Sequence, residues 1–444
     1  MFNAVADTMS HAESGYGSDY VDALVYGGAG WKGTTITYSF APGSGATAWT
    51  ASEKLAFADA FKCYENICNL RFAEGTYHAD KYSATSIVLN KVPGATWTTQ
   101  PGWVVLADFN LPTNGFNGYW GALNGRFNYE HTSWVNLTPG GLGFNTIIHE
   151  LGHGLGLDHP FGSTPFPGVT SGDSTDLGDY NLDQGIWSIM AYNHDWNDSP
   201  ADSWYYGYEQ TPMSFDVAAM QTMYGANTTY KTGNDIYALP TTEVTGTGWT
   251  CIWDAGGIDT ITSAGATSAC VINLNDYPKT GGVVSEPYVS YNEGSQIAGG
   301  FTIADGVIIE NAVGGNGADT ITGNGVNNTL TGNSGADKFV FNTALAASNI
   351  DTITDFTVTQ GDVLQLDDAI FTALAGSITV ASDAFCSGAD ITTAANANDY
   401  LIYNTTTGAM YYDRDGSAST YAAVEFAILL NKPIDITAAQ FVVI

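Results

Sequence analysis

Three histidines and a glutamate give the sequence its clearest chemistry. They occur in one run, His149-Glu-Leu-Gly-His-Gly-Leu-Gly-Leu-Asp-His159-Pro. On a helix, residues four positions apart lie on the same face, so the imidazoles of His149 and His153 can reach one ion. Zinc in proteins takes such nitrogen ligands in a tetrahedral set. The spacing therefore predicts a zinc site on this helix.

Gly156 and His159 supply the rest of the predicted site. A glycine here can take a left-handed conformation, end the helix and turn the chain, so that His159 returns to the same metal. Glu150, beside the first ligand, is then the general base that acts on water rather than a ligand. The short HExxH pattern can arise by chance on a surface helix, but the longer pattern fixes three ligands, a base and a turn.

The elements that must position these residues follow from local signals. Thr50 and Glu53 form a capping box at the start of a helix, and the helix with the zinc motif should begin near Asn145. Composition and flanking turns predict three further pieces, namely a strand at Gly33–Phe40, a strand-like segment at Ser133–Leu137 and a helix at Ser214–Tyr224.

Charge excludes several classes of function. The chain has 12 Lys plus Arg against 45 Asp plus Glu, a net charge of −33. Phosphate backbones and anionic membranes would repel it, so we expect no nucleic-acid partner. No apolar run is long enough for membrane insertion, and the start of the sequence lacks the regions of a Sec signal peptide. We expect a monomer that is exported by another route or has lost its leader.

The five cysteines do not form a metal motif, because none occurs in a CxxC pair. Cys63 and Cys68 are expected on one helix, about 8 Å apart, beyond the reach of a disulfide. We interpret both as small buried apolar residues. Cys251 and Cys270 flank a Gly-rich turn, and the sequence is equally compatible with a disulfide between them and with two free thiols.

A nine-residue repeat occurs in the second half, at Gly314–Thr322, Gly323–Thr331 and Gly332–Val340. The turn residues of such a repeat can bind calcium through carbonyls and an Asp carboxylate, and its last residues form a short strand with an inward apolar side chain. A related turn, DAGGIDTI, begins at Asp254. The alternative is a Gly/Asn-rich turn set that supports strands without metal.

The pattern along the chain predicts an α+β protein in three parts. Residues 1–18 are expected to be a flexible leader or pro-segment. Residues 19–228 are expected to form the catalytic domain, with both helices and strands. Helical periodicity disappears after Asn227, so residues 229–444 are expected to form an all-β domain.

The zinc motif resembles that of the metzincin proteases, and Pro160 directly after the third histidine resembles the serralysin branch. Ser188–Tyr192 (SIMAY) is similar to the Met-turn of that family. The resemblance implies that Met190 lies beneath the zinc and that Tyr192 is a further zinc ligand, which swings away to stabilise the oxyanion. The similarity runs from about Asp19 into the repeats, although the linker from Pro160 is long and the repeat array is short. It implies a metzincin catalytic domain with a twisted mixed sheet and helices at residues 19–228, followed by a parallel β-roll or sandwich at residues 229–444.

The repeats resemble the RTX parallel β-roll, in which each turn uses two nonapeptides and calcium lies between repeats 18 residues apart. This implies that Asp319 and Asp337 share one calcium ion. Its carbonyl ligands are expected from residues around four glycines, Gly315, Gly317, Gly332 and Gly335.

Two further calcium positions follow from the same resemblance. On the opposite side of the roll, Glu310 is expected to stack with Asn328 as a weaker pair. Asp254, Gly256 and Asp259 resemble the separate calcium turn at the start of this domain in serralysins.

The resemblance implies a secreted, extracellular zinc endopeptidase of proteins or peptides, with one catalytic Zn²⁺ and several structural Ca²⁺. It also implies export by a type I (ABC) secretion system through an uncleaved C-terminal signal, which the apolar end Ala438–Ile444 fits. A calcium-dependent adhesive or matrix protein with a vestigial protease domain is the alternative, which the complete ligand set disfavours. An astacin is disfavoured by Pro160 and by the repeats.

Overall fold

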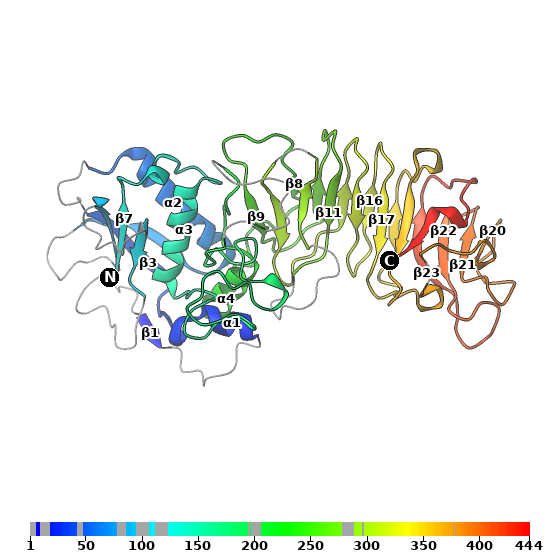
Figure 1. Ribbon diagram of the computed structural model, residues 1–444, viewed down its shortest axis with the longest axis horizontal. Helices are drawn as coiled ribbons and strands as arrows, with labels where there is room; N and C mark the ends of the chain where they lie inside the picture. The colour runs from blue at the N-terminus through cyan, green and yellow to red at the C-terminus, as the bar shows by residue number, and fades with distance from the viewer. Residues whose placement is uncertain are drawn as a thin grey trace.

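The computed structural model describes residues 6–8, 18–41, 48–77, 86–94, 106–111, 123–193, 196, 206–277, 288–294, 297–376 and 378–444. Figure 1 shows helices at the N-terminal end, stacked strands in the middle and a last group of strands at the far end. In these residues, no helix is long and apolar enough to cross a membrane.

Four α-helices lie in the N-terminal half of the described chain: α1 (Asp19–Leu24), α2 (Ala51–Ile67), α3 (Leu142–Leu155) and α4 (Ser214–Tyr224). The predicted capping box is confirmed, because the Thr50 side chain accepts from the Glu53 N–H and the Glu53 carboxylate accepts from the Thr50 N–H. The bounds of α4 are those predicted, and α3 begins three residues earlier than Asn145.

A five-stranded sheet supports these helices. Its order is β4 (Arg71–Glu74), β3 (Thr35–Ala41), β5 (Ile87–Val92), β7 (Leu123–Asn128) and β6 (Ala107–Phe109). The sheet is mixed, as expected, because β6 runs antiparallel to β7 while the other pairs are parallel. Phe57 of α2 packs edge-on against Phe127 of β7, with ring centroids 4.8 Å apart.

The prediction of a strand at Ser133–Leu137 was wrong. The segment forms a 3₁₀ turn at Thr132–Val135, and the His131 side chain accepts from the Ser133 N–H at its start. The turn brings Trp134 into the interior, where its indole N–H donates to Glu53 at 2.8 Å. That same carboxylate pairs with buried Lys91 at 2.8 Å. A buried indole needs such an acceptor, and this tertiary contact decides the local conformation.

Two larger sheets form the C-terminal half. The eight-stranded sheet has the order β24 (Phe441–Val443), β19 (Val363–Leu366), β17 (Lys338–Phe341), β15 (Thr320–Thr322), β11 (Cys270–Asn273), β12 (Ser290–Asn292), β13 (Gly300–Ile303) and β9 (Trp249–Ile252). The nine-stranded sheet has the order β20 (Phe385–Gly388), β21 (Leu401–Asn404), β22 (Ala409–Tyr412), β23 (Val424–Leu429), β18 (Asp351–Ile353), β16 (Thr329–Thr331), β14 (Asn311–Val313), β10 (Thr260–Thr262) and β8 (Ile236–Ala238). A short strand pair, β1 (Ala6–Thr8) with β2 (Ala29–Trp31), lies at the N-terminal end.

The nine-residue repeats form a parallel roll, because successive strands from β14 to β19 alternate between the two sheets. Thr320 pairs with Lys338 in one sheet and Asn311 with Thr329 in the other. Both pairs are 18 residues apart, which confirms the predicted register. The apolar residue in each repeat is fully buried between the sheets, at Ile321, Leu330 and Phe339.

All five cysteines are free thiols. Cys251 lies in β9 and Cys270 in β11, and β12 and β13 separate these strands. Three strand spacings amount to roughly 14 Å, which no disulfide spans. Of the two alternatives for Cys251 and Cys270, the structure therefore supports two free thiols and not a disulfide.

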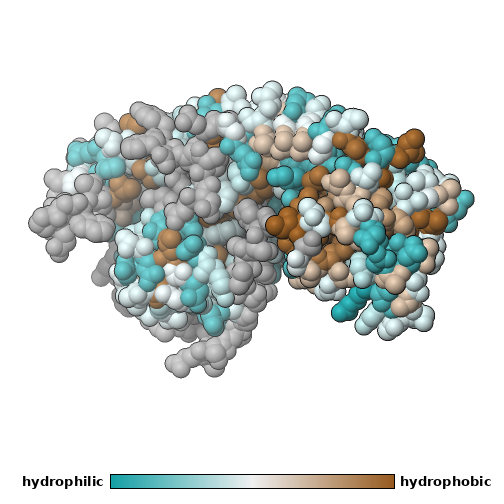
Figure 2. Space-filling model, turned by 45° about the vertical axis from the view of Figure 1, so that its right-hand side comes forward, coloured by the Kyte–Doolittle hydropathy of each residue, from teal (hydrophilic) through white to brown (hydrophobic). Residues whose placement is uncertain are grey.

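Exposed apolar side chains on the C-terminal part include Ile378, Leu430 and Ile434. Figure 2 shows hydrophobic residues interspersed with hydrophilic ones over this end of the molecule. Single exposed apolar residues are ordinary on protein surfaces, so none of these three marks a site by itself.

Candidate metal centre

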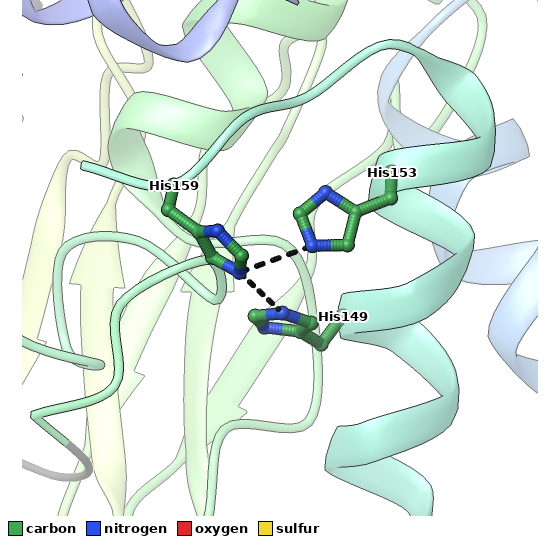
Figure 3. A group of neighbouring side chains, drawn as sticks. All are labelled: His149, His153 and His159. Carbon is green, nitrogen blue, oxygen red and sulfur yellow. Dashed lines mark hydrogen bonds between the residues drawn. The ribbon is translucent and has the colours of Figure 1, made fainter. Parts of the chain in front are cut away.

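The three predicted histidines meet at one point (Figure 3). His149 and His153 project from α3, which ends at Gly156 in the predicted left-handed conformation, with φ 109°. The chain then returns, and Nε2 of His159 lies 3.2 Å from Nε2 of His149 and 3.1 Å from Nε2 of His153. Tetrahedral ligands about 2.0–2.1 Å from zinc are roughly 3.3 Å apart, so the separations fit such an ion.

Backbone carbonyls orient two of the rings. Nδ1 of His149 lies 2.8 Å from the Ile189 carbonyl, and Nδ1 of His153 lies 2.8 Å from the Leu157 carbonyl. Because a carbonyl only accepts, each Nδ1 carries the hydrogen and each Nε2 turns its lone pair to the shared point. Burial lowers the pKa of His153, and burial together with His153 lowers that of His159 to about 3. Neutral rings of this kind can bind a metal.

Glu150 is buried beside the first ligand, on α3. Its Oε2 atom has no hydrogen-bond partner within the described part of the chain. Burial, with a smaller contribution from Asp108, raises the pKa of Glu150 to about 8. A carboxylate without a partner next to three converging imidazoles is placed to exchange a proton with a bound water.

Two aromatic rings border the histidines. Tyr192 lies with its ring centroid 4.8 Å from that of His159 and 5.7 Å from that of His149, and the residue is 45% exposed. Phe161 stacks parallel to His159, with the centroids 4.7 Å apart, and meets Tyr192 nearly edge-on. Tyr192 thus lies beside the histidines, where the resemblance implied. Phe161 was missed, because a single aromatic in a Pro/Gly-rich linker carries no signal of its own.

Met190 packs against α3 at Gly152. It is fully buried, and a Cβ on Gly152 would lie only 2.7 Å from its sulfur. The absence of a side chain at Gly152 therefore allows the turn at residues 188–192 to approach the helix.

Asp216 anchors this turn. Its carboxylate accepts from the Ser188 hydroxyl at 2.7 Å and from the Ile189 N–H at 2.6 Å, while the Met213 N–H donates to it at 2.8 Å. Ile189 in turn holds His149 through its carbonyl. Sequence reasoning missed Asp216, although an acidic residue in the first turn of a predicted helix was a usable signal.

A second group of potential ligands lies at the start of the β-roll. One carboxylate oxygen from each of Asp235, Asp254 and Asp259 lies within 4.8 Å of the others. The Gly256 N–H donates to Asp254 at 2.9 Å, and the Asp235 N–H donates to Asp259 at 2.7 Å. Three hard oxygen donors suit calcium. Sequence reasoning found Asp254, Gly256 and Asp259 but missed Asp235.

The predicted pair Asp319 and Asp337 occupies successive turns of the roll. The Asp319 N–H donates to Asp337 at 2.8 Å, and Asp319 accepts from the Gly315 N–H at 2.6 Å. Burial and neighbouring carboxylates raise the pKa of Asp337 to about 7. Gly335, with φ 140°, allows the turn to pass close to the carbonyl of Gly317.

The fourth predicted glycine, Gly332, lies against the Asp337 carboxylate. The turns that hold Asp319 and Asp337 are thus bordered by all four predicted glycines, Gly315, Gly317, Gly332 and Gly335. That the carbonyl groups of these glycines bind calcium stays a prediction.

Glu310 and Asn328 occupy successive turns on the opposite side of the roll. The hydrogen bonds of their side chains are made to other residues. Glu310 accepts from the Asp259 N–H at 2.8 Å. Asn328 accepts from the Asn324 N–H at 2.7 Å, and its own N–H donates to Asp351 at 2.9 Å. Asp351 was missed, although the triplet Asp-Thr-Ile at 351–353 repeats those at 259–261 and 319–321.

The other four histidines of the sequence lie outside the zinc motif. His131 caps the 3₁₀ turn through Nδ1, 2.8 Å from the Ser133 hydroxyl. His11, His78 and His194 lie outside the described residues.

Comparison with known proteins gives a consistent result. A family model described as the C terminal of the peptidase M10 serralysins matches residues 214–397. Serralysin C of Dickeya chrysanthemi is 34% identical over 213 residues, which are 46% of this chain and 41% of the relative. Metalloprotease AprA of Pseudomonas entomophila is 29% identical over 290 residues, 61% of this chain and 53% of the relative.

Serralysin of Proteus mirabilis is 30% identical over 286 residues, 60% of this chain and 53% of the relative. The chain thus spans about half the length of the curated relatives it matches. The alignments with AprA and with the Proteus serralysin are longer than the segment 214–444. Each of them therefore includes residues before Ser214, in the half of the chain that carries the histidine triad.

Proposed function

We propose that this chain, whose residues 214–397 match the model of the serralysin C-terminal domain, is a serralysin-type protein and a secreted zinc-dependent endopeptidase. We assign catalysis to a metzincin domain at residues 19–228 and calcium binding to residues 229–444. Its substrates would be peptide bonds of extracellular proteins. Export through a type I secretion system belongs to the same proposal.

One observation carries the catalytic assignment. The Nε2 atom of His159 lies 3.2 Å from that of His149 and 3.1 Å from that of His153, beside the buried carboxylate of Glu150. His149, His153 and His159 would hold the ion, with Tyr192 as a further ligand. When bound, zinc would polarise the scissile carbonyl and acidify water next to Glu150.

The side chains of the site divide the remaining work. Glu150 takes a proton from the attacking water and delivers it to the leaving amine. The Tyr192 hydroxyl donates a hydrogen bond to the oxygen that gains charge as the carbonyl becomes tetrahedral. The Ile189 and Leu157 carbonyls keep the imidazoles oriented throughout.

Metal removal tests the function. The purified chain should contain one zinc and hydrolyse a quenched-fluorescence peptide, 1,10-phenanthroline should abolish hydrolysis, and added zinc should restore it. Undiminished hydrolysis by zinc-free protein would contradict the proposal. A zinc-loaded chain without hydrolysis would favour the adhesive protein with a vestigial protease domain.

Replacing Tyr192 with phenylalanine should lower kcat by about 100- to 1,000-fold, because it removes one donor to the developing oxyanion. KM and zinc content should change little, since the three imidazoles remain. Tyr421→Phe, at an exposed tyrosine of the C-terminal part, is the matched control. Steady-state kinetics measure kcat and KM for both variants. Equal kcat values would exclude Tyr192 as a donor to the oxyanion.

A further inference from the structure

Asp183 is a buried aspartate whose carboxylate has no hydrogen-bond partner among the described residues. The residue is 0% exposed, and both carboxylate oxygens share this lack of a described partner. Burial removes a carboxylate from water, and the ionised form is then strongly unfavourable unless a positive charge or several donors replace the water. An aspartate in this position needs either a proton or a cation.

Most of the other buried carboxylate oxygens without a partner belong to predicted metal sites. In the part of the chain that the structure describes, they occur on Glu150, Asp259, Asp337 and Asp415. Glu150 adjoins the histidine triad, Asp259 belongs to the three-aspartate group, and Asp337 lies in a turn predicted to bind calcium. Among the described residues, Asp183 alone leaves both oxygens without a partner, and neither the triad nor the roll contains it.

The backbone holds Asp183 in place. Its N–H donates to the Leu177 carbonyl at 3.1 Å, and its carbonyl accepts from the Asn193 side chain at 2.9 Å. Gly185 closes the loop by donating to the Asn193 carbonyl at 2.7 Å. These contacts tie the linker to the segment that follows Tyr192 and fix the backbone from which the carboxylate extends.

The surrounding charge favours a cation over a proton. Asp176 lies close enough that its negative charge, added to burial, raises the pKa of Asp183 to about 7. The two oxygens of Asp176 accept from the N–H groups of Thr170 at 2.9 Å and Gly178 at 3.1 Å. Each keeps a lone pair for a further partner. With a pKa of about 7, Asp183 is only partly protonated at neutral pH, and its ionised form then needs a cation in place of the water it has lost.

We propose that Asp183 binds a calcium ion, and that this ion joins the linker, which begins at Pro160, to the turn at residues 188–193. Calcium accepts bidentate carboxylates together with carbonyl oxygens in irregular geometry, as a loop of this kind provides. The site is distinct from the zinc ligands and from the roll. It stands whether or not the chain hydrolyses peptides.

Calcium counting tests this site. Wild type, Asp183→Asn and the matched control Asp173→Asn, at an exposed aspartate of the same linker, should be equilibrated with calcium and measured by mass spectrometry of the metal. We expect Asp183→Asn to contain one calcium fewer than wild type and Asp173→Asn to contain the full number. An unchanged number in folded Asp183→Asn would show that Asp183 is held as a neutral acid, since asparagine mimics that form.

Unmodified protein provides a second test that does not depend on how the variant folds. Crystals grown with Tb³⁺ should show an anomalous peak within coordination distance of Asp183. Peaks at the roll aspartates with none at Asp183 would overturn the proposal.

Discussion

Replacing Glu150 with glutamine should lower kcat/KM for a peptide substrate by about 100- to 10,000-fold, the range that general acid–base catalysis contributes. Glutamine has nearly the same shape but cannot accept the proton of the attacking water. The zinc content should stay at one ion per chain, because the three imidazoles that converge beside this residue are unchanged. Peptide hydrolysis and metal analysis on the same preparation measure both quantities.

Glu65→Gln on α2 makes the same chemical change outside the site and should keep wild-type activity. Glu65 accepts from the Phe72 N–H at 2.8 Å, a bond that glutamine can also accept. Wild-type activity in Glu150→Gln would remove the general base from the scheme. Loss of zinc together with activity would instead make Glu150 a structural residue.

Removing calcium with a chelator should destabilise the roll. A site saturated at about 100 times its dissociation constant stabilises the folded state by about 2.7 kcal/mol, so several sites together account for much of the stability of a domain. Asp235, Asp254 and Asp259 would be left as three neighbouring carboxylates, with the ammonium group of Lys231, 2.9 Å from Asp235, offsetting only part of their charge. We expect a lower melting temperature and a smaller β signal in circular dichroism, both restored by added calcium.

The variant Asp319→Asn should show a smaller calcium-dependent gain in melting temperature than wild type. Asp390→Asn, at an exposed aspartate in the C-terminal part, should show the full gain. Identical melting curves with and without chelator for the wild-type protein would mean that the glycine-rich turns support the strands without metal.

The predictions that succeeded from sequence rest on short-range or periodic rules. A capping box fixes where α2 begins, and a left-handed glycine fixes where α3 ends. The 18-residue register follows from the repeat length. In these cases the residues that determine the structure are close in sequence or recur at a constant interval.

The failures depend on contacts between distant parts of the chain. Trp134 turns inward because Glu53, 81 positions away, accepts its N–H. Asp235 joins Asp254 and Asp259 because parallel pairing of β8 with β10 aligns their turns. Glu310 lies one turn from Asn328, as predicted, but it also meets Asp259, 51 positions away, because β14 pairs with β10. No local pattern reports such neighbours.

The alternation of strands between two sheets limits how this domain can change in length. Between residues 311 and 340, successive nine-residue repeats lie on opposite faces. Deleting a single repeat would move every later strand of this stretch to the other face and separate Asp319 from the carboxylate above it. Deleting two repeats would restore the faces. We therefore expect tolerated insertions and deletions here to come in whole turns of 18 residues.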